Sequence, residues 1–337
     1  MIIKIHLHRF FLIFTTLFLI SCGGGNETAS TERELQGRFY DSLVSGLRYE
    51  TASISGLTTA QGEFRYREGE VIRFYVGDIF LGQAQAQAIV TPVELVAGAG
   101  DENNIQVQNI VMFLQSIDED GDETNGINIT ATARNAANGQ SVDFELAEGV
   151  FEFDAAVQTL ISNITAANGQ ARTIVTRTQA KETFRKNLLT LFVGRYEGSF
   201  SGDDTGSWSV YIYADGKIWG KSISNDSGSN TISGEISSGG QAVISGTVGT
   251  AVFSGKFSRS GEVSGSWVDG SHVTGSFNGR RSSPFFFGNG TTETDSPIPG
   301  IGQPDSEGGS SGAGFSGGGL VLTGENSDFG SVSDNVQ

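Results

Sequence analysis

An acidic run between Asp118 and Ile127, Asp-Glu-Asp-Gly-Asp-Glu-Thr-Asn-Gly-Ile, holds the residues best suited to chemistry. Carboxylates at alternate positions and an asparagine amide oxygen are ligands that a hard cation such as Ca²⁺ prefers, and the glycine permits the tight turn between them. The run therefore predicts a calcium site, with Asp118, Asp120, Asp122 and Asn125 as its ligands. The alternative interpretation is a solvated acidic turn that follows a helix and holds no metal.

Cys22, the only cysteine, lies directly after a short apolar block, Phe10–Ile20, and one small residue, Ser21. A cleaved signal segment typically has a basic N-terminal region, then an apolar block too short to span a membrane, and then a small residue. Residues 1–21 have all three features. If the Cys22 thiol is modified, no thiol remains for disulfides, zinc binding or nucleophilic catalysis. An ordinary secretion signal that happens to end in cysteine is the alternative.

The tetrapeptide Leu19-Ile20-Ser21-Cys22 resembles the lipobox of bacterial lipoproteins. This resemblance implies that residues 1–21 are a signal peptide and that Cys22 carries covalent lipid, including palmitate. Gly23 in place of aspartate implies delivery to the outer membrane, with either face exposed. Several acyl chains, each buried CH₂ contributing about 0.8 kcal/mol, make such an anchor effectively permanent.

Composition excludes several function classes. Removal of residues 1–21 takes away Lys4 and Arg9 and no acid, so the net charge moves from −17 to about −19. Such a chain repels nucleic acid and anionic headgroups, so we expect no nucleic-acid partner and membrane contact through the lipid alone. His272 is the only histidine that remains after cleavage, which excludes a His-rich metal centre.

Residues 37–194 predict a β-rich domain with packing helices, after a polar tether at residues 22–36. Apolar side chains alternate with polar ones through residues 62–66 and 71–76, as in half-buried strands. Helical spacing and capping residues then predict three helices, from Asn104 to Ile117, from Asp154, and from Thr176 or Thr178 to Gly194.

A spaced motif runs through residues 38–130 and includes Asp41, Gly46, Thr58, Gly62, Phe64, Asn109, Gln115 and Asp118. This motif resembles a module that recurs in envelope and adhesin-like proteins of Gram-negative bacteria. Its first half also resembles transthyretin-type sandwiches, which implies a β-sandwich-like fold. The acidic run resembles the calcium loops of EF-hand-like and thrombospondin-type repeats, although Ile129 stands where an EF-hand has its bidentate glutamate.

Residues 195–281 predict an antiparallel barrel of eight strands. Five copies of apolar-Ser/Thr-Gly-x-apolar recur about every ten residues, a period of one strand and one turn, and three further strands precede them. The apolar residues and the glycine share one face, and the other face is polar, the reverse of a transmembrane barrel. The glycines of the five copies are Gly234, Gly246, Gly255, Gly265 and Gly275.

Trp208 and Trp267 are candidate ligand-binding residues inside this barrel, although core packing is the simpler interpretation of both. The layout is similar to the water-soluble barrels of surface lipoproteins of the transferrin-binding-protein-B type. Residues 282–337 are rich in glycine, serine and acids, and their composition predicts a disordered tail.

The fold class expected is therefore mainly β with some helix, a sandwich-like N-terminal domain and an eight-stranded soluble barrel. The function expected is non-enzymatic binding or adhesion to a surface protein or glycan. Two alternatives stay open: a lipocalin-like carrier of a small apolar ligand, and an envelope glycan hydrolase that uses paired carboxylates.

Overall fold

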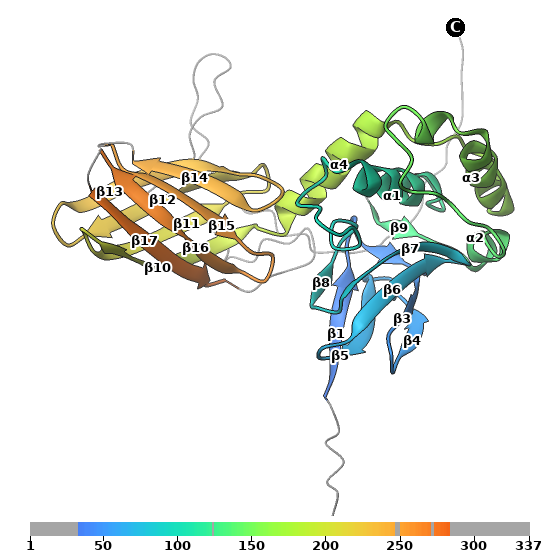
Figure 1. The fold of residues 1–337 in the computed structure, drawn as a ribbon, viewed down its shortest axis with the longest axis horizontal. Coiled ribbons are helices and arrows are strands. Elements are labelled where there is room, and N and C mark those ends of the chain that lie inside the picture. Colours follow the sequence, from blue (N-terminus) through green and yellow to red (C-terminus); the bar gives the residue numbers. More distant parts are fainter. Residues whose placement is uncertain (1–32, 123–124, 247–249, 271–272, 284–337) are drawn as a thin grey trace, which may run out of the picture. The chain divides into compact units, whose positions relative to one another are not determined.

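The computed structural model describes residues 33–122, 125–246, 250–270 and 273–283 (Figure 1). Cys22, His272 and nearly all of the predicted tail lie outside these residues, so the predictions about them stay predictions. The described residues belong to one unit, Met1–Pro299. Its architecture confirms the predicted fold class, because strands predominate, a few helices accompany them, and eight strands close into a barrel.

The first half of the chain forms three small sheets. Their strand orders are β5-β1-β8, β4-β3-β6-β7 and the two-stranded β2-β9. The strands are β1 (Glu34–Phe39), β2 (Val44–Ser45), β3 (Arg48–Glu50), β4 (Ser55–Leu57), β5 (Glu63–Arg67), β6 (Val71–Val76), β7 (Ile79–Gln85), β8 (Ile89–Val90) and β9 (Ile127–Asn128).

The two larger sheets pack through aromatic side chains, as a sandwich requires. The rings of Phe39 on β1 and Phe74 on β6 lie 4.6 Å apart, and Phe64 on β5 lies 5.4 Å from Phe74. All three are buried, whereas Arg65 and Arg73, one position along their strands, are exposed. The alternation in the sequence therefore identified the buried face correctly.

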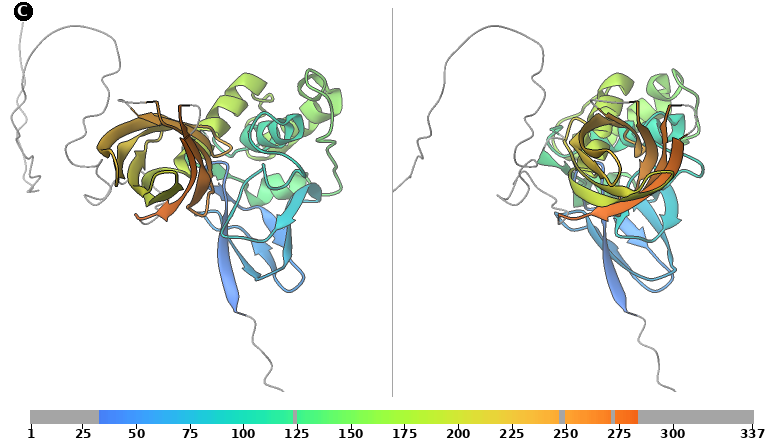
Figure 2. Two further views of the ribbon diagram at one scale, coloured as in Figure 1. Left: turned by 60° about the vertical axis from the view of Figure 1, so that its left-hand side comes forward. Right: turned by 90° about the vertical axis from the view of Figure 1, so that its left-hand side faces the viewer.

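Four α-helices gather at one end of these sheets (Figures 1 and 2). They are α1 (Ile105–Ser116), α2 (Ala131–Ala136), α3 (Ala155–Ala167) and α4 (Arg177–Thr190). Asn104, Asp154 and Thr176 are the N-caps of α1, α3 and α4, and each side chain accepts a bond from a backbone N–H of the first turn. The predicted starts of α1 and α3 are thus confirmed, and of the two candidates for α4, Thr176 and Thr178, Thr176 is the cap.

Strand β1 and helix α2 are among the elements that differ from the sequence-based expectation. Strand β1 begins at Glu34, inside the segment expected to be tether, and pairs along its length with β5. Its exposed first residues give it little hydrophobic alternation, so pairing rather than pattern defines it. Helix α2 was not predicted because six residues are too few to show a helical period; Thr130 caps it.

Strands β10 to β17 follow one another in a closed antiparallel barrel. The first and last strands close it, with Tyr196 opposite Arg281 and Gly202 opposite Gly275, and Figure 2 shows the strands around a common axis. The strands are β10 (Gly194–Gly202), β11 (Gly206–Ile212), β12 (Lys217–Ser224), β13 (Gly228–Ile236), β14 (Gln241–Gly246), β15 (Val252–Phe257), β16 (Glu262–Asp269) and β17 (Val273–Arg281).

Glycines on the inner face of the barrel receive aromatic rings from neighbouring strands. A Cβ atom at Gly255 or at Gly265 would lie 2.5 Å from the ring of Phe277. A Cβ atom at Gly206 would lie 2.5 Å from the ring of Phe200. The repeated glycines thus make room for large side chains, in addition to letting the strands bend. The barrel interior is consequently an aromatic core, separate from the buried cluster of the first half.

Candidate functional site

The acidic run lies between α1 and β9, and the side chain of Asp118 joins its two ends by hydrogen bonds. Asp118 is 1 % exposed, and its Oδ1 accepts a bond from the backbone N–H of Asn128 at 2.8 Å. Its Oδ2 accepts a bond from the N–H of Gly121 at 3.0 Å. One buried carboxylate thereby joins both ends of the loop and aligns β9 with its parallel partner β2. This role is structural.

Asp120 organises the tip of the run. Its Oδ1 accepts a bond from the N–H of Asp122 and its Oδ2 from the side-chain amide of Asn125, both at 2.9 Å. Asp122 thus contributes its backbone to Asp120, and Asn125 contributes its amide nitrogen. The four predicted ligands therefore lie in one loop, closed by its own hydrogen bonds.

The pKa values of the buried Asp118 carboxyl and the exposed Asp120 carboxyl are shifted in opposite directions. Burial raises the pKa of Asp118 to about 6, the backbone N–H of Asn128 lowers it, and the neighbouring Asp120 raises it further. Hydrogen bonds from Asn125 and Asp122 hold the pKa of Asp120 below its usual value. Carboxyls whose pKa values are shifted in opposite directions are found in the acid–base pairs of enzymes, but the Asp118 carboxyl is buried and cannot contact a glycan.

Arg172, which sequence reasoning did not select, supplies a positive charge to this loop. Its Nη2 donates to the carbonyl of Glu119, and its Nη1 is buried without an acceptor. Gly121, at φ +77°, has no Cβ, which leaves room for this guanidinium. No group of three or more acids, histidines or cysteines in the described part of the chain is arranged to hold a metal. The side chains of the loop are therefore engaged in hydrogen bonds with one another and with the backbone, and calcium binding stays a prediction.

Several residues that carry the module resemblance serve the framework around this loop. The side-chain amide of Gln115 on α1 donates to Asp41 at 3.3 Å, and Asn109 donates to the carbonyls of Phe144 and Leu146 at 3.0 and 2.8 Å. Thr58 donates to the carbonyl of Val44 at 2.8 Å. The motif thus specifies how helix and sheets are joined.

Trp208 and Trp267 lie in the barrel core. The Trp208 ring packs edge-on against Phe277 with centroids 5.9 Å apart, and the Trp267 ring packs against Phe200 at 5.9 Å. Their indole N–H groups donate to the carbonyls of Ser199 and Ser201 at 3.3 and 3.2 Å. The structure therefore favours the core-packing interpretation over a ligand contact.

An exposed apolar surface, formed by Ala147, Val150 and Phe153 and called here the 147–153 strip, was not found from the sequence. Val150 donates its N–H to Ala147 at 3.0 Å, and Phe153 donates to Val150 at 3.2 Å. Side chains three residues apart in such turns lie above one another. Val150 is 48 % and Phe153 76 % exposed, unlike the fully buried Phe151 between them.

Contacts of the intervening residues, Phe151 and Glu152, hold the backbone of the 147–153 strip in place. The ring of Phe151 packs 5.9 Å from Phe144. Glu152 accepts two bonds from Arg177 on α4, at 3.0 and 2.6 Å, and this guanidinium keeps the pKa of Glu152 below its usual value. An exposed aromatic side chain on a fixed backbone can bind with little loss of conformational freedom. Phe151 and Phe153 lie two residues apart, and the packing of Phe151 against Phe144, which the sequence does not show, decides which of the two is exposed.

The charge around the strip is negative. No lysine or arginine lies between Arg134 and Arg172, whereas this segment contains Asp143, Glu145, Glu148, Glu152 and Asp154. Of these acids Glu152 is ion-paired. A partner with an apolar pocket and a basic rim complements this surface.

Comparison with known proteins adds no assignment. No model of a known protein family matches the chain, and a search of curated proteins found no match. Among the described residues, no helix combines the length and apolar character needed to cross a membrane.

Proposed function

We propose that this chain is a lipid-anchored outer-membrane protein that works by binding a partner protein, without enzymatic activity. The anchor is proposed from the Leu19-Ile20-Ser21-Cys22 pattern. The observation that carries the binding function is the 147–153 strip, in which an aromatic side chain stands in solvent on a rigid base.

The energetics favour a protein contact at this strip. Burying a phenylalanine side chain contributes about 1.5–3 kcal/mol, enough for one residue to dominate a small interface. The surrounding carboxylates favour basic partners and speed their approach, and added salt screens this effect.

The carrier alternative receives less support from the barrel interior. Rings of Phe277, Trp208 and Phe200 fill the space above the inward glycines, as the close approach of Phe277 to Gly255 illustrates. An eight-stranded barrel is wide enough to be filled by side chains or to hold one small ligand. Aromatic packing of this kind favours the filled state, so we expect no ligand to copurify.

The hydrolase alternative is also less favoured. Asp118 and Asp120 are the described carboxyls whose proton affinities are moved in opposite directions within one loop, but Asp118 is buried. Turnover that survives Asp118→Asn and Asp120→Asn and is lost at another carboxylate would support a hydrolase.

Site-specific photocrosslinking tests the binding proposal. Benzoylphenylalanine is placed at Phe153 in one variant and at Ile223, 52 % exposed on β12, in a matched control. After irradiation of intact cells we expect a discrete protein adduct from position 153, absent from position 223 and weaker at high salt. Equal adducts from both positions, or none from position 153, would contradict the proposal, and a carbohydrate adduct would favour a glycan partner.

The exposed face of the membrane needs a separate measurement. Protease added to intact cells, followed by an immunoblot for the barrel, distinguishes the two faces. Cleavage without lysis would support a surface role in adhesion. Protection until the envelope is opened would place the partner in the periplasm and exclude an adhesin.

A further inference from the structure

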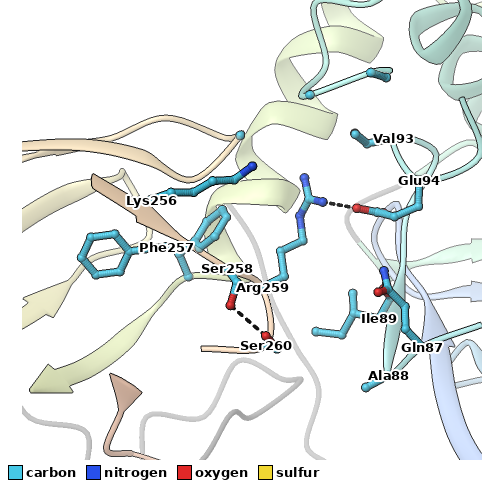
Figure 3. A pocket seen from close by; sticks show the side chains of 14 residues that line it. Gln87, Ala88, Ile89, Val93, Glu94, Lys256, Phe257, Ser258, Arg259 and Ser260 are labelled. Atoms are coloured by element: carbon cyan, nitrogen blue, oxygen red, sulfur yellow. Dashed lines mark hydrogen bonds and ion pairs between the residues drawn. The ribbon is translucent and has the colours of Figure 1, made fainter. Parts of the chain in front are cut away.

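A cavity of about 330 Å³ lies between the β7–β8 connection and the turn that joins β15 to β16 (Figure 3). Ile89, Val93 and Phe257 give it an apolar wall, and Lys256 and Arg259 give it cationic groups. Its volume is at the lower end of the range of small-molecule sites, about 300–1,000 Å³. The cavity is remote in sequence from both the acidic run and the 147–153 strip.

The charges in this cavity are not balanced. Arg259 forms an ion pair with Glu94, whose other oxygen accepts bonds from the N–H and the hydroxyl of Thr91, both at 2.7 Å. Glu94 is therefore fully engaged. The side-chain ammonium of Lys256 has no hydrogen bond or ion pair with any residue that the structure describes. One positive charge is thus left over in a chain whose net charge is −17.

Arg259 also retains an unused donor. Its Nε is buried and has no hydrogen-bond acceptor among the described residues. A buried donor without a partner is unfavourable, so an acceptor that enters here is bound more tightly than at an exposed arginine. Figure 3 shows the side chains of Lys256 and Arg259 extending toward the same part of the cavity.

We propose that this cavity binds a small organic carboxylate. The carboxylate lies between the Lys256 ammonium and the Nε edge of Arg259, and its apolar body packs on Ile89, Val93 and Phe257. One uncompensated positive charge matches one carboxylate. The apolar wall disfavours a fully hydrated inorganic dianion such as phosphate. This inference does not depend on the proposed partner at the 147–153 strip.

Ligand-detected saturation-transfer NMR on the mature chain tests the proposal, with benzoate as the probe. Benzamide has the same shape without the charge, and inorganic phosphate has charge without an apolar body. We expect saturable binding of benzoate, and little binding of benzamide or phosphate. Benzamide binding as tightly as benzoate, phosphate binding as tightly, or no saturable benzoate binding would each overturn the proposal.

Two variants identify the cavity as the site. Lys256→Gln should weaken benzoate binding about tenfold, the usual effect of losing one hydrogen-bonded charge. Arg259→Lys keeps a charge beside Glu94 but removes the Nε donor, and should also weaken binding. Lys217→Gln, at an exposed lysine 3.9 Å from Asp215, is the matched control and should bind as the parent does. Unchanged affinity in both cavity variants, with unchanged melting temperatures, would refute the site.

Discussion

Replacement of Gly255 by alanine tests whether the barrel interior is packed solid. A Cβ atom there would lie 2.5 Å from Cζ of Phe277 and 2.6 Å from the carbonyl oxygen of Ser264. Because φ at Gly255 lies outside the left-handed region, alanine can adopt the backbone conformation and the cost is steric. The ring of Phe277 must move, and the neighbouring Trp208 and Phe253 rings, 5.9 and 5.7 Å away, restrict that movement.

The expected magnitude follows from this geometry. Overpacking of one methyl group in a filled core lowers the free energy of unfolding by about 1–3 kcal/mol. Phe277→Leu removes the Cζ atom that the new methyl group meets, at a cost of about 1.5 kcal/mol on its own. Gly255→Ala should therefore cost about 1 kcal/mol less in the Phe277→Leu background than in the parent.

Denaturant unfolding of the four proteins, followed by tryptophan fluorescence, measures this coupling. Gly100→Ala is the matched control, because a Cβ there meets nothing within 4 Å and the backbone is ordinary. The control should stay within about 0.5 kcal/mol of the parent. If Gly255→Ala is neutral, or if the two substitutions add within about 0.5 kcal/mol, the ring is free to move and the carrier alternative regains support.

Three further predictions concern the acidic run and the anchor. Since the pKa of Asp118 is about 6 in the folded chain and its ordinary value is 3.8, folding takes up a proton between these values. The free energy of unfolding should therefore rise as the pH falls from 7 to 5, by about 1.3 kcal/mol more in the parent than in Asp118→Asn. Parallel pH profiles for the two proteins would contradict this assignment. If calcium binds the run, the melting temperature should rise with Ca²⁺ and return with chelator, and Asp120→Asn should abolish the rise; an unchanged midpoint would refute calcium binding. Cys22→Ser should leave an unprocessed or soluble precursor, and normal membrane fractionation of this variant would overturn the anchor.

Sequence patterns predicted correctly those elements whose structure depends on residues close together in the chain. Asn104, Asp154 and Thr176 each cap a helix through bonds within one turn, so local pattern identified the first two and narrowed the third to Thr176 or Thr178. The repeated Ser/Thr-Gly motif likewise predicted the strands of the barrel, because each strand and its turn fit within one period. Strand β1 was missed because its pairing with the more distant β5 defines it, and α2 was missed because six residues are too few to show a helical period.

The candidate ligands of the acidic run could be selected by residue type, but their arrangement could not. Asp118 became a buried clamp because Asn128, ten residues away, donates to it, and Arg172 reaches the loop from beyond α3. Neither contact has a periodic signal. The same holds for Phe153, whose exposure depends on the burial of Phe151 against Phe144.

By itself, therefore, the sequence determined the fold class, the helix starts, the polar exterior of the barrel and the expectation of a lipid anchor at Cys22. Tertiary structure alone decided which rings cover which glycines, how the acidic run is closed, and that Lys256 and Arg259 share a cavity with Ile89. The physical reason is the separation along the chain over which each interaction acts. Propensities, caps and alternation act within about one turn or one strand, whereas packing and buried charge depend on residues brought together only when the chain has folded.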